Sequence, residues 1–225
     1  MNYTLSPIAH IQSDFQTKFG IPRQSRLAPS LQSVIYFEEK YRSIDALRGL
    51  EAYSHIWLIW QFSETLRETW SPMIRPPRLG GNKKVGVFAS RSPFRPNGLG
   101  LSLVELVRID QTKEGPCLVV RGADLMDGTP IFDIKPYLPF TESIPDAKGG
   151  YANDHKDDHL HVIFPEVLLQ KIPPEKREAL IETLAQDPRP SYQEDDHRVY
   201  GFYFCNMDIR FTVANGALTV VEIVK

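Results

Sequence analysis

The chain has 225 residues, of which 42% are hydrophobic and 24% charged, and its formal net charge is −2. These values are typical of a soluble globular protein with one large or two smaller domains. The sequence has no run of about eighteen apolar residues, which excludes a transmembrane helix. With only Cys117 and Cys205, a disulfide framework or cysteine metal site is not needed.

The first residues lack the basic start and the apolar stretch of a signal peptide, so we expect a cytoplasmic protein. Residues 1–140 are expected to form short strands separated by proline, glycine and serine. The strongest is 54–62, which is rich in aromatic and β-branched residues. A short helical segment is expected at about 45–50, with Asp45 as its N-cap. The other expected strands are 8–11, 34–37, 85–89, 101–109, 118–120 and 131–134.

The order of these elements favours a β-barrel or a sandwich, because long helices do not alternate with the strands as they do in a doubly wound parallel sheet. The region also lacks glycine-rich dinucleotide or phosphate loops, a serine elbow and a zinc-protease helix.

A polar segment at 141–165 predicts a linker or long loop. It contains aspartates and histidines between Asp154 and His161. A solvated loop is favoured over a metal site, because neither cysteine nor helical context accompanies them. A helix is then expected from Pro173 to Leu184. Strands are expected at 199–204, 209–213 and 218–223, with a hairpin turn at Asn215–Gly216. We predict a barrel domain (1–140), a linker (141–165) and a small α+β domain (166–225).

Residues 69–104 carry six basic side chains and no acidic one, although the rest of the chain is acidic. Such a local positive field predicts binding of a polyanion or an anionic substrate group, and a merely solvated basic loop is the alternative. Prolines and glycines fix the shape of the backbone around the arginines, which lowers the entropic cost of binding. Its basic residues are Arg75, Arg78, Lys83, Lys84, Arg91 and Arg95.

Two acidic motifs lie further along the chain. Asp124 and Asp127 flank a turn between two expected strands, where carboxylates can serve a ligand at a barrel mouth or simply shape the turn. Asp133 and Tyr137 alternate with apolar residues and should share one face of a strand, as a polar site or as a solvated surface. Arg189 follows the expected helix in a proline-rich loop that can reach a nucleic acid.

Six stretches together resemble the TsaA-like (YaeB) family over nearly the whole chain. They are Ile21–Gln24, His55–Trp57, Arg75–Gly81, Gly86–Asn97, Asp124–Tyr137 and Gln186–Tyr192. A local departure is Gly98–Leu99, between flanks that match. The resemblance implies a methyltransferase that uses S-adenosyl-L-methionine in a β-barrel rather than a Rossmann sheet. It also implies a homodimer. The implied substrate is N6-threonylcarbamoyladenosine, the modified base beside the anticodon of threonine tRNA.

The resemblance also suggests roles for individual residues. The expected proton acceptors are Asp133 and Tyr137. Arg75, Arg78 or Arg95 would bind the threonyl carboxylate, while Lys83, Lys84 and Arg189 would hold RNA. The cofactor is placed against Pro22, Arg23, Gln24, Phe62, Ser63, Arg91, Leu101, Asp124, Leu125, Met126 and Asp127.

Two other functions compete with this interpretation. One is a non-catalytic RNA-binding barrel in which the arginines follow phosphates and the aspartates only turn strands. The other is a hydrolase or transferase of a different small molecule in the same pocket. Binding of S-adenosylmethionine separates the enzyme from the RNA-binding protein.

Overall fold

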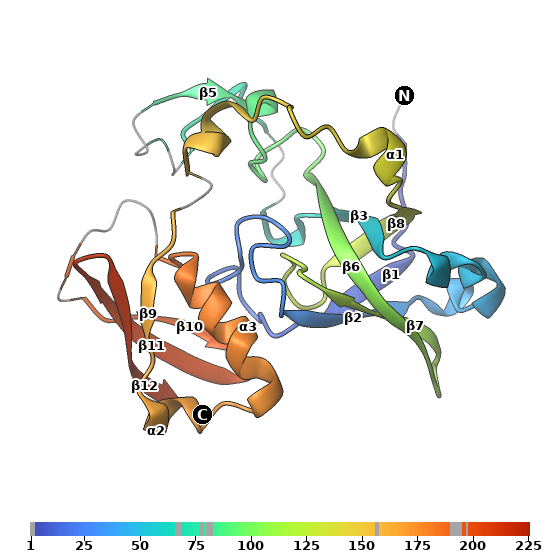
Figure 1. Cartoon of the computed structure of the whole chain (residues 1–225). Helices are drawn as coiled ribbons and strands as arrows, with labels where there is room; N and C mark the ends of the chain where they lie inside the picture. The colour runs from blue at the N-terminus through green and yellow to red at the C-terminus, as the bar shows by residue number, and fades with distance from the viewer. Residues whose placement is uncertain are drawn as a thin grey trace.

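A computed structural model describes residues 3–65, 69–76, 79, 83–155, 158–189, 195–196 and 198–225. The N-terminal half forms a closed barrel, shown on the right of Figure 1. Neighbouring strands are antiparallel throughout the ring. In ring order the strands are β1 (Ala9–Gln12), β2 (Gln32–Phe37), β7 (Gly115–Arg121), β6 (Leu99–Thr112), β3 (His55–Gln61) and β8 (Pro130–Pro136).

Strict alternation along β3 explains how the barrel acquires its core. Ile56, Leu58 and Trp60 are buried, while the residues between them are partly exposed. Because successive side chains of a strand point to opposite faces, every second residue enters the barrel. The strands expected in the barrel itself are found, although β6 extends to Leu99 and Thr112 at its two ends.

Short elements connect the barrel strands. The 3₁₀ helices are η1 (Glu39–Tyr41), η2 (Ile44–Leu47), η3 (Leu50–Ala52), η4 (Ser63–Thr65) and η6 (Val87–Ala89). Asp45 is not an N-cap, because η2 begins at Ile44 and Ser43 holds the capping position. The strand expected at 85–89 is also wrong beyond its first two residues, since β5 (Val85–Gly86) pairs with β4 (Met73–Ile74) and η6 follows at once.

A second sheet forms the C-terminal part, in the order β10 (Tyr200–Phe204), β11 (Met207–Ala214), β12 (Ala217–Val224) and β9 (His161–Ile163). Helix α3 (Pro174–Ala185) contributes Ala179, Leu180 and Leu184 to the core below this sheet. Shorter helical segments are α1 (Pro139–Glu142), η7 (Gly150–His155) and α2 (Glu166–Leu169). Strand β9 lies within the segment expected as a linker and pairs in parallel with β12. The exact domain boundary stays a prediction.

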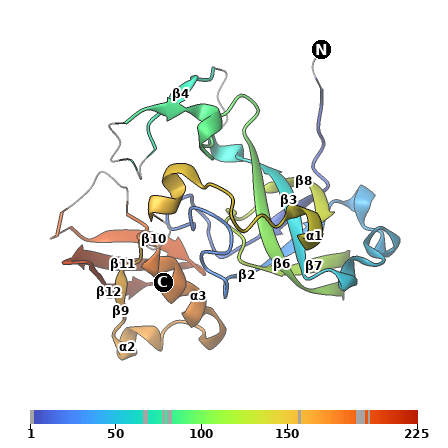
Figure 2. The same ribbon diagram turned by 45° about the horizontal axis from the view of Figure 1, so that its top comes forward.

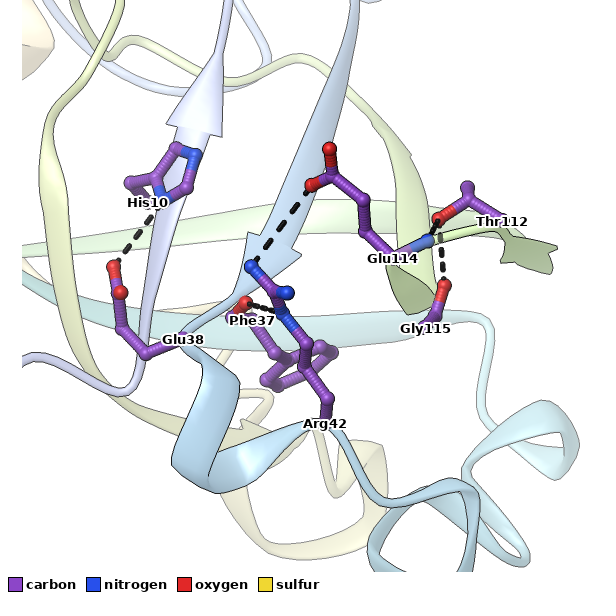
Figure 3. A network of polar contacts seen from close by, with 7 residues as sticks. All are labelled: His10, Phe37, Glu38, Arg42, Thr112, Glu114 and Gly115. Atoms are coloured by element: carbon purple, nitrogen blue, oxygen red, sulfur yellow. Dashed lines mark hydrogen bonds and ion pairs between the residues drawn. The ribbon is translucent and has the colours of Figure 1, made fainter.

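Polar contacts hold the end of the barrel where β2 finishes and β6 turns into β7 (Figure 3). Arg42 Nε donates to the carbonyl of Phe37 at 2.9 Å, and its Nη2 lies 3.9 Å from Glu114 Oε2. Thr112 Oγ1 closes the β6–β7 turn by donating to the carbonyl of Gly115 at 2.8 Å. These contacts hold the last residues of β6. The candidate site lies at the opposite end of the barrel, beside the first residues of β6.

Within the residues that the structure describes, no helix is both long and apolar enough to span a membrane.

Candidate functional site

A buried hydrogen-bond chain lies at the barrel end where β6 begins. Trp60 Nε1 donates to Ser102 Oγ at 2.9 Å, and Ser102 Oγ donates to Asp124 Oδ1 at 2.5 Å. Ser102 is fully buried. Gly100 makes room for the indole, because a Cβ at that position would lie 2.3 Å from Trp60 Cε2. These two hydrogen bonds therefore fix the direction in which the Asp124 carboxylate points.

The environment of Asp124 changes its acidity. As a whole residue it is only half-buried, but its carboxylate is turned inward toward Ser102. Loss of hydration on burial raises the pKa of Asp124 to about 6. The hydrogen bond from Ser102 and the charge of Arg91 oppose this rise without cancelling it. Asp124 is therefore a carboxylate held at an energetic cost, as is common at functional sites.

The segment with the predicted cofactor residues Pro22, Arg23 and Gln24 lies near this carboxylate, because the next residue, Ser25, donates a backbone hydrogen bond to Asp124. Arg91 Nη1 donates to Gln24 Oε1 at 2.6 Å, and Gln24 Nε2 donates to the carbonyl of Arg23 at 2.5 Å. Pro22 is buried and Arg23 is exposed. The structure thus brings Gln24, Arg91 and Asp124 to one place, although they are far apart in the sequence.

The same loop, residues 13–31, is anchored in the C-terminal core, which sequence reasoning missed. Phe15 and Leu31 are fully buried there. Gly20 lies so close to Phe202 that an added Cβ would be 2.1 Å from the ring. Ser30 donates through its backbone N–H to Glu182 Oε2 of α3 at 2.8 Å. In Figure 1 the blue loop accordingly lies between the barrel and the second sheet.

The end of β3 and the start of β6 lie at the barrel end that holds Asp124. The Phe62 ring packs against Trp60 with 4.3 Å between the ring centroids. The backbone N–H of Phe62 donates to the carbonyl of Gly98 at 2.9 Å. Ser63 is exposed at the start of η4, and Leu101 is 50% exposed on the outer face of β6. These three predicted contacts therefore share the barrel end with Asp124.

The remaining turn residues have different surroundings. Leu125 is buried in the barrel core and accepts a hydrogen bond from Ser13 Oγ at its carbonyl, at 2.9 Å. The carbonyl of Met126 accepts from Thr129 Oγ1 at 2.7 Å. Asp127 Oδ1 accepts from the N–H of Ser13 at 2.9 Å. The Asp127 carboxylate therefore holds the start of the loop 13–31 and does not join Asp124.

Asp133 of β8 and Tyr137, the residue that follows this strand, lie on the same outer face, as expected, but they do not meet. Asp133 is paired with Ile59, which is paired in turn with Leu101, so all three form one row across the strands. Tyr137 lies with His55 and Trp57, whose ring centroids are 6.3 and 6.2 Å from its own. Asp133 and Tyr137 are four positions apart, which in extended backbone corresponds to about 13 Å. Of these two residues, Asp133 is the one near the barrel end that holds Asp124. Its Oδ2 lies 2.8 Å from Lys135 Nζ.

The basic residues also divide into groups. Arg75, Lys83 and Lys84 are exposed, whereas Arg78 lies outside the described residues. Arg95 Nη1 donates to the carbonyl of Ser90 at 2.7 Å and so supports the local backbone. Both Nε and Nη2 of Arg189 bind the Asp187 carboxylate, at 2.8 and 2.9 Å. Arg95 and Arg189 therefore already hold protein groups in this structure, which sequence spacing alone did not indicate.

The donor set can be tested against S-adenosylmethionine. Its amino-acid carboxylate suits the Arg91 guanidinium, and its ribose hydroxyls suit an ionised Asp124. The Gln24 amide can donate and accept, as an adenine edge requires. The residues present fit the cofactor.

Replacing Arg91 with alanine should weaken binding of S-adenosylhomocysteine by about 10- to 100-fold, since a hydrogen bond to a charged group contributes about 1.5–3 kcal/mol. Arg91→Lys keeps the charge but loses the planar guanidinium. Its affinity should therefore lie between that of the unaltered protein and that of Arg91→Ala. Isothermal titration calorimetry measures both. An unchanged affinity in Arg91→Ala would remove Arg91 from the site.

Comparison with known proteins agrees with this geometry. Sequence models of the tRNA-methyltransferase O N-terminal domain and the TrmO C-terminal domain match residues 10–143 and 157–225. The chain is 41% identical to the tRNA (adenine(37)-N6)-methyltransferase of Escherichia coli K12, over 97% of each chain. It is 38% identical to a putative S-adenosylmethionine-dependent methyltransferase, RcsF, of Pseudomonas aeruginosa PAO1, over 94% of this chain and 93% of the relative.

A crystal structure of TrmO from Pseudomonas aeruginosa is similar over 100% of this chain and 99% of that chain, with a TM-score of 0.81 and 32% identity. The resemblance and the fold class are confirmed, and so is the assignment as an S-adenosylmethionine-dependent tRNA methyltransferase. The chain belongs to the tRNA-methyltransferase O family.

Proposed function

We propose that this protein transfers a methyl group from S-adenosylmethionine to N6 of N6-threonylcarbamoyladenosine, beside the anticodon of threonine tRNA. The observation that carries the proposal is the convergence of Gln24, Arg91 and Asp124 at one end of the barrel. The name of the Escherichia coli relative, which specifies N6 of adenine 37, supports the position of the methyl group.

The cofactor supplies a methyl group on a positively charged sulfonium, and this charge is lost during transfer. Tight negative contacts at sulfur would stabilise the starting state and oppose the reaction. Asp124 is therefore better used on the ribose hydroxyls, with Arg91 on the amino-acid carboxylate. Alignment of donor and acceptor by such contacts can contribute up to about 7–11 kcal/mol to lowering the barrier.

The acceptor nitrogen needs further help, because conjugation with the carbamoyl group makes its lone pair poorly nucleophilic while the proton remains. A general base typically contributes about 10²–10⁴-fold. Asp133 is the better of the two predicted acceptors, since it lies in one cross-strand row with Leu101. We expect Asp133→Asn to lower kcat in labelled-methyl transfer far more than Tyr137→Phe, which alters the other end of β8. Equal effects would contradict this choice.

The threonylcarbamoyl group carries a carboxylate that an arginine can bind in a bidentate manner. Among the described candidates, Arg75 is exposed whereas Arg95 is engaged with Ser90. Lys83 and Lys84 would hold phosphates of the anticodon loop, whose contacts weaken with salt. The target base lies in a single-stranded loop, so presenting it to the barrel costs only a few kcal/mol. A homodimer in the cytoplasm, where tRNA is modified, completes the proposal.

The direct test is methyl transfer from labelled S-adenosylmethionine to threonine tRNA, prepared with and without the threonylcarbamoyl group. The proposal predicts label only in the modified tRNA and, after digestion, an N6-methylated nucleoside. Equal labelling of both tRNAs would refute the substrate while leaving the methyltransferase class intact. Absence of cofactor binding would refute the enzyme itself.

A further inference from the structure

Two aromatic side chains are exposed together in the basic segment. Trp70 is 51% exposed and Phe88 is 73% exposed, and their ring centroids lie 6.1 Å apart with 34° between the ring planes. Trp70 precedes β4 and Phe88 follows β5, so pairing of these strands brings the two rings together. Figure 2 shows this hairpin apart from both sheets. The pair, called here the Trp70–Phe88 surface, has no role in the cofactor site described above.

Backbone contacts hold the surface in place. The N–H of Val87 donates to the carbonyl of Pro72 at 2.9 Å, and Val87 is buried. Ser90 Oγ donates to the carbonyl of Val87 at 2.8 Å, and Arg95 Nη1 supports Ser90 in turn. The backbone beside each ring is therefore held by hydrogen bonds, which lowers the entropic cost of binding.

The charge around the rings selects the kind of partner. Exposed Arg75, Lys83, Lys84 and Arg91 lie on this segment, and residues 69–104 contain no acidic side chain. If a second copy used the same patch across a two-fold axis, basic residues would face basic residues. RNA brings phosphates for the cations and unpaired bases for the rings. Stacking of bases on aromatic side chains beside a positive groove is how single strands are commonly held.

The surface also adjoins the proposed cofactor site. Phe88 is three residues from Arg91, whose guanidinium binds Gln24. We propose that the Trp70–Phe88 surface stacks an unpaired base of the tRNA anticodon loop, next to the adenosine that is methylated. This inference rests on the proposed function, because it takes tRNA as the substrate, and it adds the contact that orients the loop.

The test is binding of a fluorescently labelled anticodon stem–loop, followed by anisotropy and independent of catalysis. Trp70→Ala and Phe88→Ala should each weaken RNA binding about 10-fold, as expected for the loss of one stacked base. Trp70→Phe should retain most of the affinity, because a stacking ring remains. Phe140→Ala is the matched control, since Phe140 is 87% exposed but lies on α1.

Two further readouts separate stacking from other roles. The slope of affinity against salt should not change in Trp70→Ala or Phe88→Ala, whereas Lys83→Ala should reduce it by about one phosphate contact. Trp70→Ala and Phe88→Ala should bind S-adenosylhomocysteine with the same affinity as the unaltered protein.

Unchanged RNA affinity in both alanine variants would overturn the inference. So would weaker RNA binding that accompanies conversion of a dimer to a monomer in analytical ultracentrifugation, because the rings would then serve a protein interface. If ring-dependent RNA binding is found but no methyl transfer occurs, the surface stands and the proposed function fails.

Discussion

Replacing Asp124 with asparagine should make the protein more stable at neutral pH and, at the same time, nearly unable to bind the cofactor. Burial holds the pKa of Asp124 at about 6 instead of 3.8, so the folded state binds its proton more tightly than the unfolded chain does. Above pH 6 the ionised carboxylate therefore destabilises the fold, by about 3 kcal/mol for a pKa difference of this size. Asparagine removes that cost but also removes the charge that would accept the ribose hydroxyls.

The pH dependence gives this prediction its sharpest form. The stability of the unaltered protein should fall relative to Asp124→Asn as the pH rises from 4 to 6, and the difference should then stay constant. Urea unfolding at several pH values measures it, with calorimetric titration of S-adenosylhomocysteine alongside. Ser102→Ala is the matched comparison, because it leaves the charge and removes the hydrogen bond. A variant no more stable than the parent at pH 8 would contradict the account of Asp124.

Replacing Gly20 with alanine should destabilise the protein and weaken cofactor binding together. Gly20 has a φ of +84°, and its Cβ would lie 2.1 Å from Phe202. The left-handed backbone costs about 1–2 kcal/mol in an L-residue, and overpacking the core costs about 1–3 kcal/mol more. Because Gly20 is two residues from Pro22, any shift that relieves the clash should also displace the Pro22–Gln24 segment, and we expect at least a 10-fold loss of cofactor affinity.

Gly49 provides the matched control for this experiment. It has a φ of +89°, with nothing within 4 Å of an added Cβ, so Gly49→Ala carries the backbone cost alone. Its unfolding free energy should fall by only about 1–2 kcal/mol, with unchanged cofactor affinity. Equal effects of the two substitutions on binding would show that contact with the C-terminal sheet does not position the loop.

Much of the fold follows from local patterns in the sequence. The alternation of β3 and the turn at Asn215–Gly216 are short-range signals, and both elements lie where they were expected. The helix expected over Pro173–Leu184 is found one residue later, at Pro174–Ala185, where proline favours its first turn. In contrast, the pattern at 85–89 is that of a strand, but the backbone of Val87 bonds to Pro72 and turns into η6.

The candidate site was harder to predict, because it depends on contacts between distant segments. The motifs located Gln24, Arg91 and Asp124, but only the fold shows that Ser102 and Trp60 fix the carboxylate. Nothing local to Phe15 or Gly20 indicates that their loop lies against the C-terminal sheet. The alternation at Asp133 and Tyr137 correctly predicted a common face, yet the length of an extended strand keeps the two side chains apart.

The most direct test of the central claim is a crystal structure of the complex with S-adenosylhomocysteine. The account predicts the ligand at the barrel end, with its carboxylate near Arg91, its ribose hydroxyls on Asp124 and the Pro22–Gln24 segment against its base. Density for the ligand at the opposite end of β3, beside His55 and Tyr137, or anywhere beyond reach of both Arg91 and Asp124, would contradict it.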